Sequence, residues 1–259
     1  MEFLSLKEVQ SELLKMLAYL TDVLEKNGIN YFVSSGTCLG AIRHGGFIPW
    51  DNDIDLFMFR EDYEKFLALK VDEPFYILSP DSDDTVYPFA KFCNSDFALE
   101  ENIIRKQYNK YNLFIDVFPL DYLPEDEEER KKVLDEKTAT RAKVHYACYK
   151  GATPLKEIIK KIYSIFHGKG YVKKLKRKLN SFGYPEKTSH IMDLNWGITP
   201  LSTEFFDGFE YKDFDGVKVR VPAKWHDYLN CIFGDYMKLP PEEKRITHDL
   251  SVYKTKDKQ

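Results

Sequence analysis

The stretch YFVSSGTCLGAIRHGGFIPWDNDIDLFMF, residues 31–59, decides how we expect the chain to fold. Residues 31–33 form a short apolar run that ends in Ser34-Ser35-Gly36, and residues 37–43 have the composition of a helix. An acidic segment follows at residues 51–55 and leads directly into the apolar run 56–59. This order predicts a strand, a glycine-containing turn, a helix, and a second strand that carries acids at its start.

The acidic segment Asp51-Asn52-Asp53-Ile54-Asp55 has the clearest chemistry of this stretch. In a strand, Asp53 and Asp55 point to one face and Ile54 to the other. Two carboxylates about 4 Å apart repel by about 4 kcal/mol at an effective dielectric constant of 20. A fold can relieve this repulsion by protonating one acid or by binding a divalent cation, and carboxylate oxygens suit Mg²⁺ or Mn²⁺. We therefore interpret Asp53 and Asp55 as metal ligands and catalytic acids.

The turn before the predicted helix is a candidate phosphate site. Backbone N–H groups at a helix N-terminus bind anions, and Gly36 lets the backbone approach closely, so we assign Ser35 and Gly36 to phosphate binding. Arg43 and Lys91 are further candidates for contact with a phosphate or nucleotide, although a solvated lysine explains Lys91 equally well. Each short pattern alone is common in surface loops, so the prediction rests on their combination.

A third acid lies in the strand-like run NLFIDVFP, residues 112–119. Asp116 is its only charged residue, and an aspartate in a buried strand is costly unless it is paired or bound to a metal. We interpret Asp116 as the third carboxylate of the site. The alternative is an ion pair with an arginine in the core.

Composition limits the class of protein. The chain has 259 residues, of which 43% are hydrophobic and 31% charged, as in soluble globular proteins. Its net charge of −4 argues against general nucleic-acid binding. The N-terminus lacks the pattern of a signal peptide, which predicts a cytoplasmic protein. Four widely spaced cysteines predict reduced thiols and no zinc site: Cys38, Cys93, Cys148 and Cys231.

The remaining pattern predicts an α/β (α+β) protein with two parts. We expect residues 1–125 to form a catalytic core sheet whose N-terminal helix begins at the capping box Ser5-Leu6-Lys7-Glu8. We expect residues 126–259 to form a helical insertion and a C-terminal region packed on that core. Further expected elements are helices at 60–69, across most of 126–180 and at 225–237, strands at 75–78 and 86–92, and a hairpin over 209–222.

Residues 155–178 combine an apolar stripe at helical spacing with many lysines. They can be an ordinary amphipathic helix pair, or they can rest on an anionic membrane surface. In the second case the protein would be peripheral, at the inner face of the cytoplasmic membrane.

Several motifs together resemble the LicD family, and they span nearly the whole chain. They are Leu39–His44, Gly46–Asp55, Phe114–Pro119, Phe233–Met237 and Leu239–Pro241. The resemblance implies a nucleotidyltransferase-type fold, similar to the catalytic region of fukutin-related proteins. It also implies transfer of phosphocholine from CDP-choline to a sugar hydroxyl of a bacterial surface glycan, such as teichoic acid or lipopolysaccharide, which could be lipid-linked. Relatives move other groups, including aminoethylphosphonate and ribitol phosphate.

Carried over by position, the resemblance makes Asp53, Asp55 and Asp116 the metal-binding and catalytic acids, and Ser35 and Gly36 the phosphate turn. Trp50 is a candidate wall for a quaternary ammonium and His248 a candidate substrate contact, although such a histidine is more often a plain surface residue. Two alternatives stay open: nucleotidyl transfer from CTP, and a catalytically inactive binding protein of this fold. The intact set of acids argues against the second.

Overall fold

The computed structural model describes residues 3–255 apart from 102, 109, 182–185 and 194–199. Its centre is a mixed β-sheet, and the strands of its main path are, in spatial order, β1 (Phe32–Val33), β2 (Asp55–Phe59), β5 (Asn112–Tyr122), β4 (Ala90–Glu101) and β10 (Leu250–Lys254). β2 and β5 run parallel, whereas β4 is antiparallel to both β5 and β10. Three more strands extend this sheet: β3 (Phe75–Leu78) on β4, β6 (His190–Asp193) on β5, and β7 (Leu201–Ser202) on β6.

Helices pack around the sheet and bury its apolar residues. α1 (Leu6–Lys26) begins at the predicted capping box, in which Ser5 and Glu8 bond each other's backbone N–H groups. Its apolar stripe is buried against β5 and the strand β9 described below. The other helices of the core are α2 (Ser35–Arg43), α3 (Arg60–Leu67) and α7 (Trp225–Phe233). Short 3₁₀ helices lie elsewhere along the chain at Lys106–Tyr108, Thr203–Phe206 and Glu242–Lys244.

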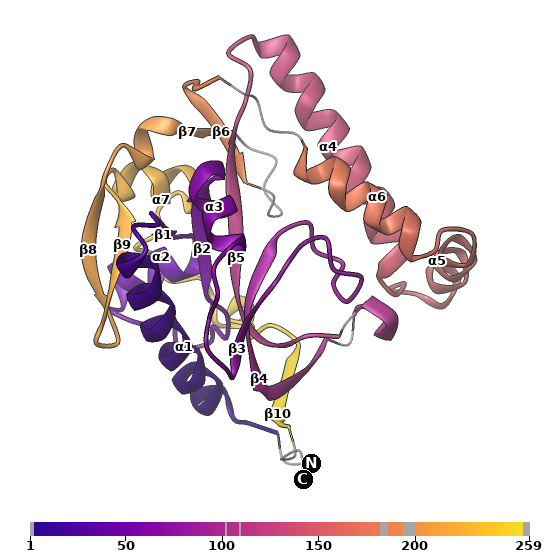
Figure 1. The fold of residues 1–259 in the computed structure, drawn as a ribbon, viewed down its shortest axis with the longest axis horizontal. Coiled ribbons are helices and arrows are strands. Elements are labelled where there is room, and N and C mark those ends of the chain that lie inside the picture. The colour runs from indigo at the N-terminus through magenta and orange to yellow at the C-terminus, as the bar shows by residue number, and fades with distance from the viewer. Residues whose placement is uncertain (1–2, 102, 109, 182–185, 194–199, 256–259) are drawn as a thin grey trace.

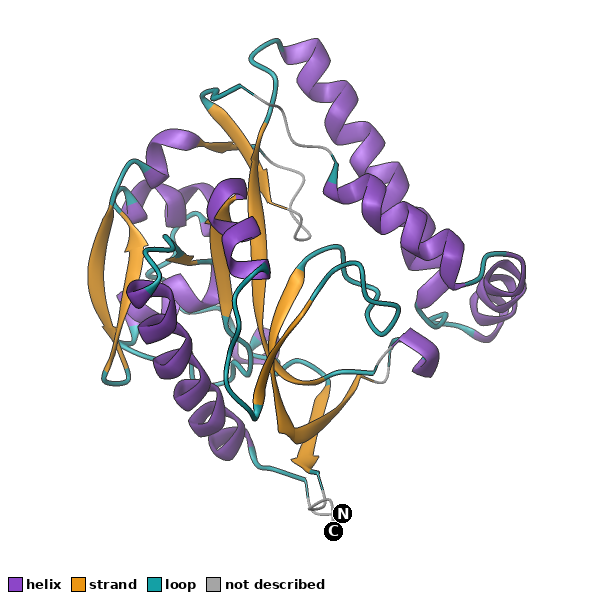
Figure 2. Cartoon of the chain, viewed as in Figure 1, coloured by secondary structure: helices purple, strands orange, loops and turns teal. Residues whose placement is uncertain are grey.

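A helical region lies on the other side of the molecule (Figures 1 and 2). α4 (Glu127–Cys148) and α6 (Lys169–Asn180) pack side by side, and α5 (Pro154–Phe166) lies at their outer end. These helices share a small apolar core of their own with the segments on either side of β4. Because β6, β7 and β10 all follow residue 126, the C-terminal half completes the central sheet as well as packing on it.

The structure confirms the α/β class and corrects several element boundaries. The helix expected from residue 37 begins at Ser35, and the expected strand 86–92 is replaced by β4, which begins at Ala90. Residues 126–180 form three helices, and the helix expected to reach residue 237 ends at Phe233, before Gly234 with φ +65°. Among the described residues, no helix is both long enough and apolar enough to cross a bilayer.

The predicted hairpin is present as β8 (Phe209–Phe214) and β9 (Val217–Pro222). Asp215 and Gly216 both have positive φ, 50° and 88°, as a tight two-residue hairpin turn requires. This turn docks on the loop after α2, where the N–H of Phe47 donates to the Asp215 carboxylate at 2.9 Å. The hairpin therefore fixes the loop that leads into the acidic segment.

The contact between α2 and this loop leaves no room for a side chain at Gly40. A Cβ there would lie 2.5 Å from the carbonyl oxygen of Gly46 and 3.3 Å from the ring of Phe214. We expect Gly40→Ala to lower the free energy of unfolding by about 1–3 kcal/mol, because the overpacked site must shift. Urea denaturation measures this change.

Gly170 in α6 is the matched control, since among the described residues no atom would lie within 4 Å of a Cβ there. Gly170→Ala should leave stability unchanged or raise it by up to about 1 kcal/mol, through helix propensity. Equal effects of the two substitutions would contradict this account of the α2 contact.

Candidate active site

Three charged residues lie in a row across the sheet. In the parallel pairing of β2 and β5, Asp55 is directly opposite Asp116, and in the antiparallel pairing of β5 and β4, Asp116 is opposite Lys91. Directly opposed residues project from the same face of a sheet, on strands about 4.8 Å apart. Strand register therefore brings together residues that are far apart in the sequence.

Two further acids precede β2 and reach the same place. One oxygen each of Asp51 and Asp53 and a ring nitrogen of His248 lie within 4.8 Å of one another. His248 Nδ1 is 3.2 Å from Asp53 Oδ2 and 3.8 Å from Asp51 Oδ1. The pairing of β10 with β4 delivers His248 to the acids, because it places Leu250 beside Glu101.

Helix α2 and the acidic segment are tied together by hydrogen bonds. The N–H of Asp55 donates to the Thr37 hydroxyl at 2.9 Å, and the N–H of Ser34 donates to the carbonyl of Asp55 at 3.0 Å. A Cβ at Gly36 would lie 2.8 Å from Asp51 Oδ2, so the missing side chain lets this carboxylate approach the first turn of α2.

One backbone N–H group at the N-terminus of α2 already has a hydrogen-bond acceptor within the protein. Ser35 adopts φ +47°, and its N–H donates to the buried hydroxyl of Tyr228 in α7 at 3.0 Å. The N–H groups of Gly36 and Thr37 belong to the first turn, which offers them no carbonyl within the helix. They are the donors that the predicted phosphate turn contributes.

Burial and neighbouring charges shift the pKa values of these acids. It raises the pKa of Asp51 to about 8, with the charge of Asp53 as the next cause. Burial also raises the pKa of Asp55 well above its usual range, again with the charge of Asp53 next. For Asp53, burial acts in the same direction, but the hydrogen bond and charge of His248 outweigh it and the pKa is lowered. The Asp53 bond in turn raises the pKa of His248 to about 9.

Lys91 compensates Asp116 inside the protein. Its side chain is fully buried, and Nζ donates to Asp116 Oδ1 at 2.5 Å. Aromatic rings surround the ammonium, with centroids 3.3 Å away for Phe114 and 4.1 Å for Tyr87. Burial raises the pKa of Asp116 to about 6 even though Lys91 opposes the shift.

These groups line one cavity of about 540 Å³. Its charged wall contains Asp51, Asp53, Asp55, Asp116 and His248, with Ser35 and Gly36 at the end of α2. Its apolar wall is made of rings: Tyr87, Phe89, Phe114, Phe118, Tyr149 and Phe233. An acidic centre beside ring faces can hold a cation-bound phosphate and an organic cation in one space.

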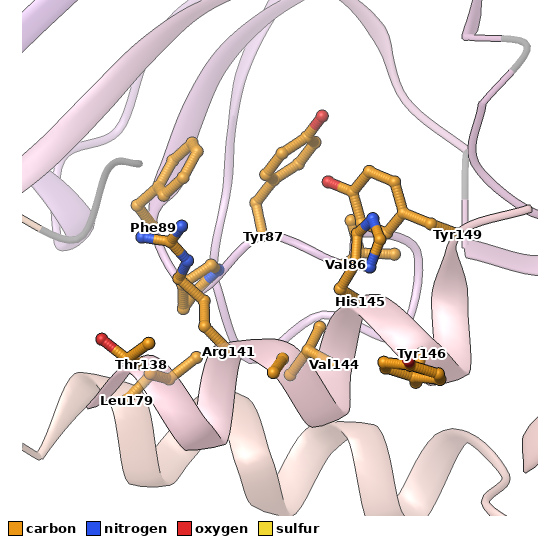
Figure 3. A pocket seen from close by; sticks show the side chains of 12 residues that line it. Val86, Tyr87, Phe89, Thr138, Arg141, Val144, His145, Tyr146, Tyr149 and Leu179 are labelled. Atoms are coloured by element: carbon orange, nitrogen blue, oxygen red, sulfur yellow. The ribbon is translucent and has the colours of Figure 1, made fainter. Parts of the chain in front are cut away.

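A second chamber of about 280 Å³ adjoins this cavity, and the two share Tyr87, Phe89 and Tyr149. Figure 3 shows Arg141 and His145 projecting from α4 toward these rings. The acid cavity therefore continues toward the helical region.

The sequence model of the family described as LicD/FKTN/FKRP, nucleotidyltransferase domain, matches residues 28–158, about half of the chain. The chain belongs to the LicD family. It is therefore a LicD-type transferase, and the resemblance drawn from the motifs is confirmed.

Curated relatives support this membership. The lipopolysaccharide cholinephosphotransferase LicD of Haemophilus influenzae is 29% identical over 266 residues, which cover 96% of this chain and 98% of that protein. The human ribitol 5-phosphate transferase FKRP is 34% identical over 102 residues, 39% of this chain and 19% of FKRP. The human ribitol-5-phosphate transferase FKTN is 37% identical over 68 residues, 26% of this chain and 14% of FKTN.

Not every residue singled out in the sequence of this LicD-family member lies in the acid cavity. Arg43 Nη1 donates to the carbonyl of Tyr236 at 2.7 Å, and Arg245 lies over the Trp50 ring at 5.3 Å; neither Arg43 nor Trp50 lines the cavity. Lys91 faces Asp116 instead of open space. Trp196, a second tryptophan that could contact a ligand, lies outside the described residues. The substrate roles of these residues stay predictions.

Asp51 and Glu101 also line the cavity, and the sequence interpretation assigned no role to either. The spacing of Asp51, Asp53 and Asp55 at every second position is the signal that could have included Asp51. Glu101 accepts hydrogen bonds from the hydroxyls of Tyr87 and Tyr111, and only the pairing of β4 with its neighbours reveals its place.

The donor set of this LicD-type site fits a hard divalent cation. The carboxylates of Asp51, Asp53, Asp55 and Asp116 face one cavity, and Gly36 makes room for the Asp51 oxygen beside a helix N-terminus. The raised pKa values of Asp51 and Asp55 express the electrostatic cost of these acids without a cation. Oxygen ligands of this kind suit Mg²⁺ or Mn²⁺.

The buried ion pair of Lys91 and Asp116 should contribute to the free energy of unfolding. In EDTA, we expect Lys91→Met to lower the free energy of unfolding by about 3–5 kcal/mol, because it leaves a buried carboxylate without its partner. Adding Asp116→Asn should recover about 1–3 kcal/mol of that loss. Urea denaturation of the two single variants and the double variant measures this coupling.

The control is the Lys131–Asp135 pair of α4, whose side chains are 75% and 67% exposed. The same double-mutant cycle there should show no measurable coupling, because water screens an exposed pair. Additive effects at Lys91 and Asp116 would mean that their contact contributes nothing to folding.

Proposed function

We propose that this chain is a divalent-cation-dependent transferase that moves phosphocholine from CDP-choline to a hydroxyl of a bacterial cell-surface glycan, of lipopolysaccharide or teichoic acid type. One observation carries the proposal: Asp51, Asp53, Asp55 and Asp116 line one cavity beside the N-terminus of α2. The Haemophilus influenzae relative, matched over nearly its full length and named for cholinephosphotransfer to lipopolysaccharide, supports the choice of substrates.

The reaction exchanges one P–O bond for another. The acceptor hydroxyl oxygen attacks the choline-bearing phosphorus, the bond from that phosphorus to the bridging oxygen breaks, and CMP leaves with the electron pair. The carboxylate of Asp116 takes the hydroxyl proton as general base. Lys91 holds this carboxylate in place through the 2.5 Å hydrogen bond to Oδ1.

The residues around the diphosphate have separate roles. Asp51, Asp53, Asp55 and Asp116 would hold Mg²⁺ or Mn²⁺, which neutralises the diphosphate and stabilises the charge that develops at phosphorus. The N–H groups of Gly36 and Thr37 bind phosphate oxygens at the helix N-terminus. His248 holds the Asp53 carboxylate in its orientation, with Nδ1 3.2 Å from Asp53 Oδ2.

The choline head group lies against ring faces of the apolar wall. A quaternary ammonium has no hydrogen-bond donor, so rings and nearby negative charge are its natural partners. Tyr87, Phe89 and Tyr149 offer such faces between the acid cavity and the second chamber (Figure 3). These rings, rather than Trp50, would then bind the quaternary ammonium.

We place the reaction in the cytoplasm. All four cysteines are free thiols, and Cys38, Cys93 and Cys148 are buried. Unpaired thiols are the usual state in a reducing compartment.

Two other donors would use the same acids. A polyol phosphate donor fits the names of the human relatives, and CTP would make the reaction a nucleotidyl transfer. Release of CMP identifies transfer of the phospho-alcohol, whereas release of pyrophosphate from CTP identifies nucleotidyl transfer. Mass spectrometry of the glycan after incubation with CDP-choline decides which group was added.

Removal of one acid should stop the reaction. We expect Asp53→Asn and Asp55→Asn to reduce CMP release to background. Asp55→Asn should leave stability unchanged or slightly higher because carboxylate repulsion falls, whereas Asp53→Asn also loses the ion pair with His248. EDTA should silence the unaltered protein in the same assay. Asp22→Asn on the exposed face of α1 is the control and should keep full activity. Near-normal turnover by either site variant with Mg²⁺ present would make the assignment wrong.

The head group gives a separate prediction about affinity. We expect CDP-choline to bind at least ten-fold more tightly than CDP-ethanolamine, a difference of about 1.4 kcal/mol that cation–π contact can supply. Calorimetric titration of both donors with Mg²⁺ and no acceptor measures it. Equal affinities, or preference for the primary amine, would move the proposal to an aminoethyl-type donor.

A further inference from the structure

Helix α5 presents its apolar side to solvent. Six large apolar side chains of this 13-residue helix are between 50% and 79% exposed: Leu155, Ile158, Ile159, Ile162, Ile165 and Phe166. Their spacing puts all six on one face of the helix. We call this face the α5 stripe. Helices on a protein surface normally bury such a face, so the α5 stripe needs an occupant.

Polar contacts on the opposite side hold α5 in this orientation. Glu157 accepts from Arg105 Nη1 at 2.8 Å, and Lys160 Nζ donates to the carbonyl of Lys150 at 3.2 Å. The hydroxyl of Tyr163 lies 3.2 Å from that of Tyr171 in α6. The side of α5 that packs on the protein is thus the polar and aromatic one, and the outward direction of the stripe is built into the fold.

The segment of the chain that contains the stripe carries a strong positive charge. Residues 150–178 contain ten lysines and arginines and one glutamate, a net charge of +9, in a chain whose net charge is −4. The remainder of the chain therefore carries −13. Lys156 and Lys161 are exposed and lie on opposite flanks of the stripe.

The lysines of α6 mostly serve the protein itself. Lys176 is buried and donates to the carbonyl oxygens of Ser82 and Thr85. Arg177 pairs with Asp81 at 3.1 Å, and Lys178 pairs with Glu136 of α4. Of the region 155–178 singled out in the sequence, α5 is the part whose apolar side faces outward, because the apolar residues Val172, Leu175 and Leu179 of α6 are buried.

We propose that α5 lies in the headgroup region of an anionic phospholipid membrane, with the α5 stripe inserted and Lys156 and Lys161 at the lipid phosphates. An apolar face between cationic flanks matches such a surface. A symmetric pair of α5 helices would instead bring the same positive flanks together, which opposes dimerisation through this face.

The membrane contact also bears on the acceptor, and this step rests on the proposed function. Tyr149, which lines the acid cavity, lies five residues before α5 begins. The carbonyl of Ile103, another lining residue that is 53% exposed, accepts from the N–H of Lys150 at 2.9 Å. Docking of α5 thus brings this wall of the cavity near the bilayer. A glycan that is linked to a lipid in the inner leaflet can then enter the cavity.

The test is co-sedimentation of the full chain with vesicles at low salt. One set contains phosphatidylcholine with 30 mol% phosphatidylglycerol, and the other phosphatidylcholine alone. We expect the protein to prefer the anionic vesicles and Ile158→Ser/Ile162→Ser to lower the partition coefficient at least ten-fold. Leu239→Ser/Ile246→Ser, which changes two exposed apolar residues elsewhere, is the matched control and should bind normally. Lys156→Glu/Lys161→Glu should remove the preference for anionic lipid.

Both serine variants should unfold at the same temperature as the unaltered chain, because the replaced side chains are exposed. Their CMP release with a soluble acceptor should also match it, so failure of the proposed function is visible independently of vesicle binding. Equal sedimentation of the unaltered chain and the α5 variant, or none by either, would overturn the proposal. So would a dimer in light scattering that Ile158→Ser/Ile162→Ser converts to a monomer.

Discussion

The register of three strands is the constraint on which this site depends. Parallel pairing of β2 with β5 sets Asp55 beside Asp116, and antiparallel pairing of β5 with β4 adds Lys91 to the same row. A slip of one residue in either pairing would turn part of this row to the opposite face of the sheet. Apolar neighbours oppose such a slip, since Ile54, Leu56, Ile115 and Val117 are all buried. The core thus fixes the relative positions of the charges that the chemistry needs.

Gathering acids in a low-dielectric cavity has an electrostatic cost, and the fold lowers it locally. Lys91 opposes Asp116 from within the sheet, and His248 opposes Asp53 from the C-terminal segment. Burial and the charge of Asp53 raise the pKa values of Asp51 and Asp55, so the fold favours the neutral forms of these two acids more than water does. In the proposed function, a divalent cation would take over this compensation.

Local patterns in the sequence were sufficient to predict the α/β class and to single out Asp53, Asp55 and Asp116, because an acid within or just before an apolar strand is visible without neighbours. The catalytic and metal-binding roles of these acids stay predictions. The partners of these acids were not predictable in this way. Lys91 meets Asp116 only through non-local register, and His248 reaches Asp53 only because β10 pairs with β4. Asp51 gains its place from the absence of a side chain at Gly36. The stripe of α5 was visible in the sequence, but its outward direction depends on the contacts of Glu157 and Lys160.

The most direct measurement is anomalous diffraction from crystals grown with Mn²⁺ and CDP-choline in the absence of acceptor. The proposed function predicts an anomalous peak coordinated by carboxylate oxygens of Asp53 and Asp55, with the donor diphosphate between this peak and the first turn of α2. The choline group should lie against the rings that include Tyr87 and Tyr149. A donor bound elsewhere, with no anomalous peak among these acids, would contradict it.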